Sequence, residues 1–263
     1  MKKIAIIFSI LFIIVSAIYF VFFTPEKYEE TDMLEEITRR GKIRVGINLG
    51  SKPFGFLDSE YRICGYDADM GRYIAQYLLH NPNNIEFVPV TPSNRMLKAS
   101  TGEVDIVIAT MTITPSRREI INFSIPYDSA GQAVLVKTNS KISAISDLAG
   151  LNVGVIFGTT AEKNMKTLVP TANILGFKNY IDAYKALKNG QIDAITSDDT
   201  LLSRFTFEDK GVKLLPKRYS REPYGIAFKK GKGTKKFEEK LNFAISDMKR
   251  KKVITRLHKK WLG

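Results

Sequence analysis

The sequence predicts an α/β fold built on parallel sheets. Apolar strand patterns alternate with amphipathic helical patterns along most of the chain, beginning near residue 42. Segments rich in hydroxyl and charged residues follow several of these predicted strands directly. Because ligands of parallel α/β sheets bind beyond the carboxyl ends of the strands, a binding site is expected in those segments.

The fold is predicted to open with a strand at 43–47, followed by a hairpin region at 54–64. A helix follows at 67–79, because apolar residues recur there at helical spacing. Further strands are predicted at 85–90, 104–109, 134–136, 152–156, 191–196 and 224–228. Further helices are predicted at 94–100, 161–168, 180–188, 199–207, 235–248 and 251–261.

Composition excludes several classes of protein. The 263 residues include one Cys and two His, so an internal disulfide and a structural zinc site are both excluded, and no cofactor is expected. The net charge of +13 comes from lysines spread over most of the chain, with one dense run at 249–260 in a helical pattern. Since a solvated helix face is the commoner origin of such a run, nucleic acid is not expected as a partner.

The amino terminus predicts the compartment. Two lysines precede twenty uncharged residues, 4–23, which are enough to span a bilayer. The body of the chain is therefore expected outside the cytoplasm, in a periplasm or on the outer face of the cytoplasmic membrane. Residues 1–27 are assigned to a hydrophobic signal or anchor and a linker. The candidate cleavage site at 15–17 lies inside the apolar run, and an uncleaved anchor is favoured over a cleaved signal because the apolar length suits a span better than a short signal core.

Arg117 is the first candidate binding residue. Thr114 and Pro115 predict a helix start, with the hydroxyl as N-cap, and this start places Arg117 in the first turn. A cation in that turn is disfavoured by roughly 0.3 to 1 kcal/mol unless an anion lies beside it. The alternative is a surface Arg117 paired with Glu119 or Asp105.

Two further segments run from a predicted strand into a helix. Thr159 and Thr160 begin one helix, where free N–H groups and hydroxyls form either an anion site or a simple capped turn. No P-loop spacing accompanies them, so nucleotide hydrolysis has no support. Of Asp198 and Asp199, one is expected to cap the next helix, which leaves the other to face a crevice as the partner of an ammonium group. Together the three segments would hold a zwitterion at both ends.

Six short motifs occur in a specific order and spacing: Gly65-Tyr66-Asp67-Ala68-Asp69-Met70, Thr112-Ile113-Thr114-Pro115, Phe123-Ser124-Ile125-Pro126-Tyr127, Asp147-Leu148-Ala149-Gly150, Gly158-Thr159-Thr160-Ala161-Glu162 and Pro223-Tyr224-Gly225-Ile226. With these motifs, residues 34–263 resemble the bacterial extracellular solute-binding proteins, family 3, of amino-acid ABC transporters. The resemblance implies a two-lobe periplasmic-binding-protein-like (type II) fold with two hinge crossovers. Lobe 1 is expected at 32–131 plus 225–263, and lobe 2 at 132–224.

The resemblance also implies roles for single residues. Arg117 would clamp the α-carboxylate of an amino acid, assisted by Thr112 and the region of Thr160, and Asp198 would bind the α-ammonium group. A guanidinium suits a carboxylate because it donates two parallel hydrogen bonds. Thr110 stands where many family members have Gly, which narrows the wall of the binding pocket.

The ligand class is predicted from the segment 89–95, which resembles the aspartate- and glutamate-binding subgroup. In that subgroup an Arg at the position of Arg95 reads the side-chain carboxylate, and Lys52 would add charge. A second cation left unpaired in a closed cleft costs several kcal/mol, so a second ligand carboxylate fits it. The alternative is a solvent-facing Arg95. Tyr224, at the second crossover, either closes over the ligand or packs in the hinge.

The sequence therefore predicts a monomeric, non-enzymatic binding component that captures an acidic amino acid by hinge closure and delivers it to ABC permease subunits. Two alternatives stay open. A few proteins of this fold are cyclohexadienyl dehydratases, which need a general acid in the cleft, and Glu162 is the nearest spare carboxylate. The other alternative is a ligand-sensing module for a membrane receptor.

Overall fold

The computed structural model describes Ser16 and residues 32–263. Residues Asp32–Gly263 form one compact unit, and this unit contains every sheet and hydrophobic core described below. The predicted anchor at 4–23 lies outside the described residues, apart from Ser16. Within the described part of the chain, every helix is too short or too polar to cross a bilayer.

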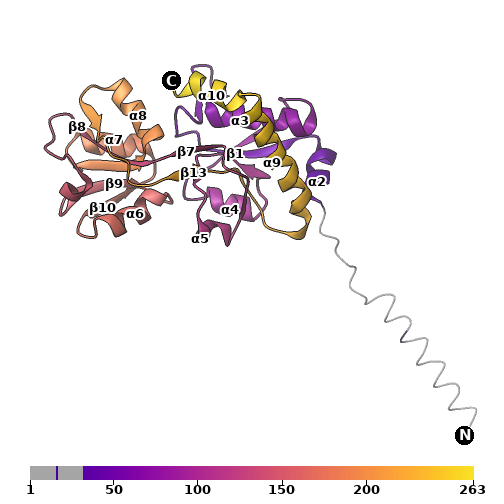
Figure 1. Ribbon diagram of the computed structural model, residues 1–263, viewed down its shortest axis with the longest axis horizontal. Coiled ribbons are helices and arrows are strands. Elements are labelled where there is room, and N and C mark those ends of the chain that lie inside the picture. The colour runs from indigo at the N-terminus through magenta and orange to yellow at the C-terminus, as the bar shows by residue number, and fades with distance from the viewer. Residues whose placement is uncertain (1–15, 17–31) are drawn as a thin grey trace, which may run out of the picture. The chain divides into compact units, whose positions relative to one another are not determined.

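The first sheet has five strands in the order β4-β1-β5-β14-β6. Strand β1 pairs in parallel with β4 and β5, whereas β14 pairs antiparallel with β5 and β6. The strands are β1 (Ile43–Ile47), β4 (Ile85–Pro89), β5 (Ile106–Val107), β6 (Asn122–Phe123) and β14 (Ala227–Phe228). Its helices are α2 (Met33–Arg40), α3 (Tyr66–Leu79), α4 (Arg95–Ser100), α5 (Pro115–Arg118), α9 (Lys235–Arg250) and α10 (Val253–Trp261). Figure 1 shows α9 lying along α2 and α3.

The second sheet also has five strands, in the order β10-β9-β11-β8-β12. Strand β9 pairs in parallel with β10 and β11, and β8 pairs antiparallel with β11 and β12. The strands are β8 (Gln132–Lys137), β9 (Asn152–Ile156), β10 (Asn173–Phe177), β11 (Ala194–Asp198) and β12 (Val212–Leu214). The helices that cover it are α6 (Thr160–Leu168), α7 (Tyr180–Lys188) and α8 (Asp199–Glu208). The predicted α/β class with parallel strand pairs is confirmed.

The chain crosses between the two sheets twice. Strand β7 (Asp128–Ala130) leads from the first sheet into the second, and β13 (Glu222–Tyr224) leads back. Strands β7 and β13 pair with each other in antiparallel orientation, and in Figure 1 they link the half of the unit built on the first sheet to the half built on the second. The remaining elements are the hairpin β2 (Phe56–Leu57) and β3 (Ile63–Cys64) and two 3-10 turns, η1 (Ile145–Leu148) and η2 (Lys232–Thr234). The exact lobe boundaries stay a prediction.

Local capping explains where two helices begin. The side chain of Asp32 accepts hydrogen bonds from the N–H groups of Leu34 and Glu35, which fixes the start of α2. The hydroxyl of Thr114 accepts one from the N–H of Arg117 at 3.2 Å, and Pro115 takes the first helical position. The predicted helix start at Thr114 is therefore confirmed.

Candidate functional site

A small cavity lies where strands of both sheets end. Its volume is about 10 Å³. The residues that line it are Asn48, Pro92, Arg95, Thr110, Thr112, Thr159, Thr160, Tyr180, Asp198 and Leu201. Most of them follow the carboxyl ends of β1, β5, β9, β10 and β11, or lie at the starts of the helices that come next. This is the position that parallel α/β sheets offer to ligands.

Asp198 supplies the carboxylate of the cavity. It is the last residue of β11, is 7% exposed, and accepts a hydrogen bond at 2.5 Å from the hydroxyl of Tyr224 to its Oδ2. Burial raises the pKa of Asp198 to about 6, although the Tyr224 bond and the charge of Arg95 both act to lower it. An ammonium group beside Asp198 would favour the ionised form.

The prediction that one carboxylate of this pair caps α8 is wrong: Asp198 is the N-cap residue but its side chain makes no capping hydrogen bond, and Asp199 is the first helical residue. Its Oδ1 accepts from the N–H groups of Gly131 and Thr200, at 3.1 and 2.8 Å, and its Oδ2 lies 2.7 Å from Nε of Arg218. Asp199 is therefore held by the start of α8 and by a surface ion pair. Asp198 is the carboxylate left to face the cavity.

Arg95 supplies a buried cation. It is the first residue of α4, is 3% exposed, and donates from Nη1 to the carbonyl oxygens of Ala109 and Thr110. Its Nε is buried and has no hydrogen-bond partner among the described residues, and none of their carboxylates forms an ion pair with it. Burial lowers the pKa of Arg95. Since an unpaired buried charge is costly, this position favours an anion.

Arg117 lies beside the cavity and does not line it. Its Nη1 donates to the carbonyl oxygen of Thr112 at 2.8 Å, and its Nη2 donates to that of Gly158 at 3.0 Å. The first acceptor follows β5 in the first sheet, and the second lies between β9 and α6 in the second sheet. Burial, and then the charge of Arg95, lower the pKa of Arg117 to about 10. Arg117 thus bonds the two halves together at the edge of the cavity.

Thr110 has a strained backbone. Its φ is 47°, a value that is unfavourable for a β-branched residue and easy for glycine. The buried carboxylate of Asp67 holds it there, because Oδ2 accepts from the N–H of Thr110 at 3.0 Å while Oδ1 accepts from the hydroxyl of Tyr127 at 2.9 Å. Burial raises the pKa of Asp67 to about 7. A glycine at this position would adopt the same φ without this strain.

Thr159 and Thr160 form the opposite wall at the start of α6. The hydroxyl of Thr159 donates to the carbonyl oxygen of Ile156 at 2.7 Å. The preceding Gly158 has a φ of 78°, and a Cβ there would lie 2.5 Å from the carbonyl oxygen of Pro92. Glycine is therefore required for the close approach of this turn to the Pro92 segment.

Besides Arg117, two more predicted binding residues do not line the cavity. Lys52 is half-exposed: its Nζ lies 3.5 Å from Oε1 of Glu208 and 5.6 Å from the ring centre of Phe56. Tyr224 is fully buried at the crossover, where its hydroxyl donates to Asp198. It therefore positions Asp198, which agrees better with packing in the hinge than with closing over a ligand.

Four lining residues were not predicted: Asn48, Pro92, Tyr180 and Leu201. Asn48 directly follows β1, so the rule that located the other candidates also applies to it. Tyr180 begins α7 just after β10, a strand that sequence patterns did not indicate. Within residues 32–263 the acidic, His and Cys side chains form no group able to hold a metal ion.

Comparisons with known proteins agree with this geometry. Residues 43–263 match the model of the bacterial extracellular solute-binding proteins, family 3. A glutamine-binding protein of Geobacillus stearothermophilus is 39% identical over 74% of this chain and 76% of its own. The ABC transporter glutamine-binding protein GlnH of Bacillus subtilis is 35% identical over 90% of this chain and 86% of its own.

A solved structure shows the same fold. It is an ancestral amino-acid-binding protein, described as a precursor of cyclohexadienyl dehydratase. It is 33% identical to this chain and has a TM-score of 0.81, covering 88% of this chain and 99% of its own. The predicted two-lobe periplasmic-binding-protein-like (type II) fold is confirmed.

Proposed function

Because this chain belongs to the bacterial extracellular solute-binding proteins, family 3, and is an amino-acid-binding protein of the ABC-transporter type, we propose that its ligand is an acidic amino acid, aspartate or glutamate. The predicted family is confirmed. In this proposal the cavity holds the ligand between Asp198 on one side and Arg95 and Arg117 on the other.

Charge balance carries the proposal. The cavity and its edge hold two cations, Arg95 and Arg117, and one carboxylate, Asp198. A zwitterion with a neutral side chain adds no net charge and leaves one cation without a counter-charge. A second carboxylate on the ligand neutralises it. Removing one partner of a buried charge pair typically costs about 2–5 kcal/mol. A difference of that size in binding free energy between an acidic and a neutral amino acid is large enough to select the acidic one.

The small volume supports binding by hinge closure. A cavity of about 10 Å³ has room for about one water molecule, so the walls must separate to admit an amino acid. Arg117 bonded to Gly158, and Ser93 donating to the carbonyl oxygen of Phe157 at 3.4 Å, are contacts between the two halves that such opening would break. The crossover pair β7 and β13 would carry the bend.

Glutamine is the second candidate ligand. The two relatives named above are called glutamine-binding proteins, and the amide side chain of Asn48 lies in the cavity wall. An amide of the ligand would hydrogen-bond with Asn48. In that case Arg95 would serve the α-carboxylate or the cavity wall, and its charge would not select the ligand.

Calorimetric titration of residues 32–263 tests the proposal. Glutamate and aspartate are expected to bind more tightly than glutamine. Arg95→Met keeps an unbranched apolar stem and removes the charge, so it should weaken glutamate binding by about 100-fold or more and glutamine binding by much less. Tight glutamine binding together with no binding of either acidic amino acid would reject the acidic ligand.

The proposed location and partners follow from the family. The protein acts outside the cytoplasm, anchored by residues 4–23 as a monomer, and passes its ligand to ABC permease subunits. Capture of a membrane receptor without any permease would favour the sensory alternative.

A dehydratase would need a spare acid in the cavity, where Asp198 is the single carboxyl group among the described residues. Formation of product from prephenate or arogenate would revive that alternative.

A further inference from the structure

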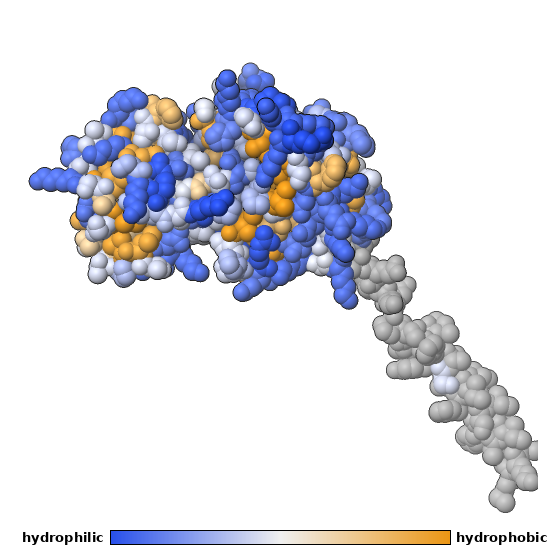
Figure 2. Space-filling model, viewed as in Figure 1, coloured by the Kyte–Doolittle hydropathy of each residue, from blue (hydrophilic) through white to orange (hydrophobic). Residues whose placement is uncertain are grey.

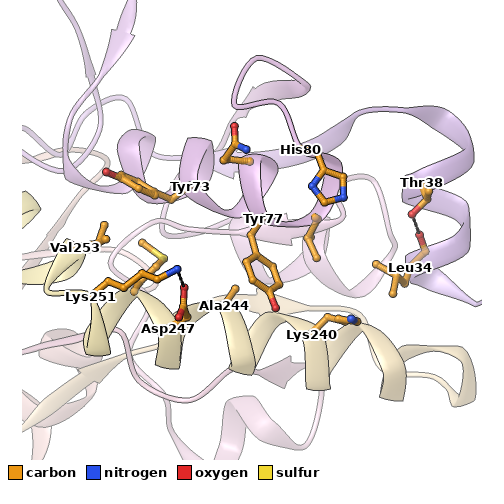
Figure 3. Close-up of a pocket in the computed structure, with 13 residues that line it drawn as sticks. Leu34, Thr38, Tyr73, Tyr77, His80, Lys240, Ala244, Asp247, Lys251 and Val253 are labelled. Carbon is orange, nitrogen blue, oxygen red and sulfur yellow. Dashed lines mark hydrogen bonds and ion pairs between the residues drawn. The ribbon is translucent and has the colours of Figure 1, made fainter.

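A large groove opens where α3 packs against α9. Its volume is about 580 Å³, and Figure 3 shows the side chains that line it. No residue lines both this groove and the cavity. Apolar and aromatic side chains in it come from Leu34, Tyr73, Tyr77, Leu78, Ala244, Met248 and Val253. A second hollow of about 470 Å³ has Tyr73 and Gln76 in common with it and adds Arg72, Arg256 and Lys260. The two together are called the basic groove below.

Positive charge gathers around the basic groove. Residues 235–263 contain ten Lys and Arg against three Asp and Glu, and all ten cations are exposed. Lys240 and Arg256 line the groove, and neither forms an ion pair with any residue of the described chain. The two carboxylates of the groove, Asp69 and Asp247, are each already paired with two cations. The groove therefore presents charge that no described carboxylate neutralises.

Apolar surface lies beside this charge. Figure 2 shows an apolar strip along α9 bordered by strongly hydrophilic side chains. Phe243 of α9 is 60% exposed, and its ring centre lies 5.9 Å from that of Tyr77. Exposed aromatic residues among lysines and arginines are the composition of surfaces that lie in a membrane interface.

The length of the tether supports the same partner. Leu34 and Thr38 of α2 line the basic groove, and Asp32 pairs with Lys236 of α9 at 3.1 Å. Eight residues, 24–31, separate the apolar run from Asp32. Fully extended, they span at most about 29 Å. With residues 4–23 anchored in a bilayer, as proposed above, the start of α2 lies within that distance of the membrane.

We propose that the basic groove binds the surface of an anionic phospholipid bilayer. Lys240, Arg256 and their neighbours contact lipid phosphates, while Tyr73 and Phe243 lie against the boundary between headgroups and acyl chains. Each cation held near an anionic surface contributes about fivefold in affinity. This contact orients the binding unit on the membrane that anchors it, and it rests on the extracytoplasmic, anchored location of the proposed function.

Vesicle co-sedimentation tests the groove without the anchor, with residues 32–263, which carry their own cores. Vesicles of phosphatidylcholine alone are compared with vesicles that also contain phosphatidylglycerol. The protein is expected to bind the second kind and to dissociate as salt is raised, because phosphate contacts between charges are screened. Equal binding to both kinds, or to neither, would overturn the proposal.

Paired charge reversals locate the contact. Lys240→Glu with Arg256→Glu should weaken binding to the anionic vesicles by at least about 25-fold. Lys141→Glu with Lys163→Glu makes the same change of net charge on exposed residues around the second sheet and should weaken binding much less. Equal losses in the two pairs would mean that net charge alone, and not the groove, attracts the protein.

Two further measurements keep this test independent of folding and of the amino-acid ligand. Arg256 also donates from Nη1 to the carbonyl oxygen of Lys251, so the melting temperature of its variant is compared with that of the unchanged protein. Amino-acid titrations of both variants should match the unchanged protein, because the groove and the cavity share no residue. The oligomeric state of the unchanged protein and of the groove variants is measured by analytical sedimentation. If the unchanged protein is a dimer, and the variants are monomers that still bind vesicles, the groove is an interface with a second copy of the chain and the proposal is overturned.

Discussion

The inner cavity and the basic groove carry charge in opposite ways. In the cavity, Arg95 and Asp198 are almost fully buried, and Arg95 has no ion-pair partner among the described residues. In the groove the cations are exposed: the side chains of Lys251 and Lys260 are 62% and 57% exposed and paired with carboxylates, and Lys240 and Arg256 are exposed without an ion pair among the described residues. The cavity measures about 10 Å³, and the two hollows of the groove measure about 580 and 470 Å³.

Volume is therefore a poor guide to where this protein holds a small ligand. A charge removed from water interacts strongly with whatever replaces the water, whereas an exposed ion pair is worth about 0–1 kcal/mol. The cavity is expected to control affinity for an amino acid, because its charges are desolvated. The groove is expected to act through many weak contacts with an extended surface.

The largest expected effect comes from Asp198→Asn. This change keeps a hydrogen-bond acceptor for Tyr224 and removes the charge that binds the ammonium group. We expect ligand affinity to fall by about 100- to 1000-fold in calorimetric titrations. Asp199→Asn is the matched control, because Asp199 faces Arg218 and not the cavity, and it should change affinity by less than about threefold. Similar losses in both variants would show that the pair acts through α8 and not through the ligand.

Gly158→Ala should have the next largest effect. Its Cβ would lie 2.5 Å from the carbonyl oxygen of Pro92, so the closed arrangement of the two walls would be blocked. We expect affinity to fall by about 30-fold, which corresponds to about 2 kcal/mol. Gly150→Ala is the control: its φ of 74° imposes similar backbone strain, and nothing lies within 4 Å of its Cβ.

Both glycine variants should lose about 1 kcal/mol in the free energy of unfolding, measured by urea denaturation. The control should then keep its ligand affinity. An unchanged affinity in Gly158→Ala would mean that the ligand is held without this close contact. Closure of the cavity around the ligand would then no longer distinguish it from the open groove.

Ligand affinity should depend on pH through Asp198. Its pKa is raised to about 6, so it is ionised at pH 7, and below pH 6 the ligand ammonium must displace a proton. Affinity is then expected to fall by about tenfold between pH 7 and pH 5 and to be fully present above pH 7. Titrations at a series of pH values measure this fall. Asp198→Asn should remove it, and a fall that persists in the variant would point to another group.

Much of the site was predictable from the sequence, because a parallel α/β sheet binds ligands beyond the carboxyl ends of its strands. This rule predicts Thr159, Thr160 and Asp198, which line the cavity, and Arg117, which lies at its edge. The family resemblance, and not this rule, predicted Arg95 and the roles of Thr110 and Thr112, which also line the cavity. The same rule applied to the first strand would have found Asn48. The helix start at Thr114 was also readable from sequence, since capping depends on neighbours along the chain.

Other features depend on tertiary packing and were not readable. The direction of Lys52, which reaches Glu208 and not the cavity, is set by a loop. Sequence alone left Arg95 either in the cleft or in solvent, because its burial depends on how α4 packs. Strand β10 (Asn173–Phe177) was missed because it is a half-exposed edge strand without strict alternation. Helix α2 (Met33–Arg40) was missed despite its Asp32 cap.

The smallest expected effect is that of Lys260→Ala in the basic groove. Its Nζ lies 2.8 Å from Oδ2 of Asp69, but Asp69 also accepts from Nε1 of Trp261 and pairs with Arg72. Losing one exposed partner of three should lower the free energy of unfolding by less than about 1 kcal/mol in urea denaturation. Ligand affinity should stay within about twofold. Lys259→Ala, at an exposed neighbour without an ion pair among described residues, is the control. A loss of several kcal/mol in the free energy of unfolding, seen for Lys260→Ala and not for the control, would mean that an exposed ion pair of the groove contributes as much as a buried charge of the cavity. The degree of exposure would then not explain the difference between the two regions.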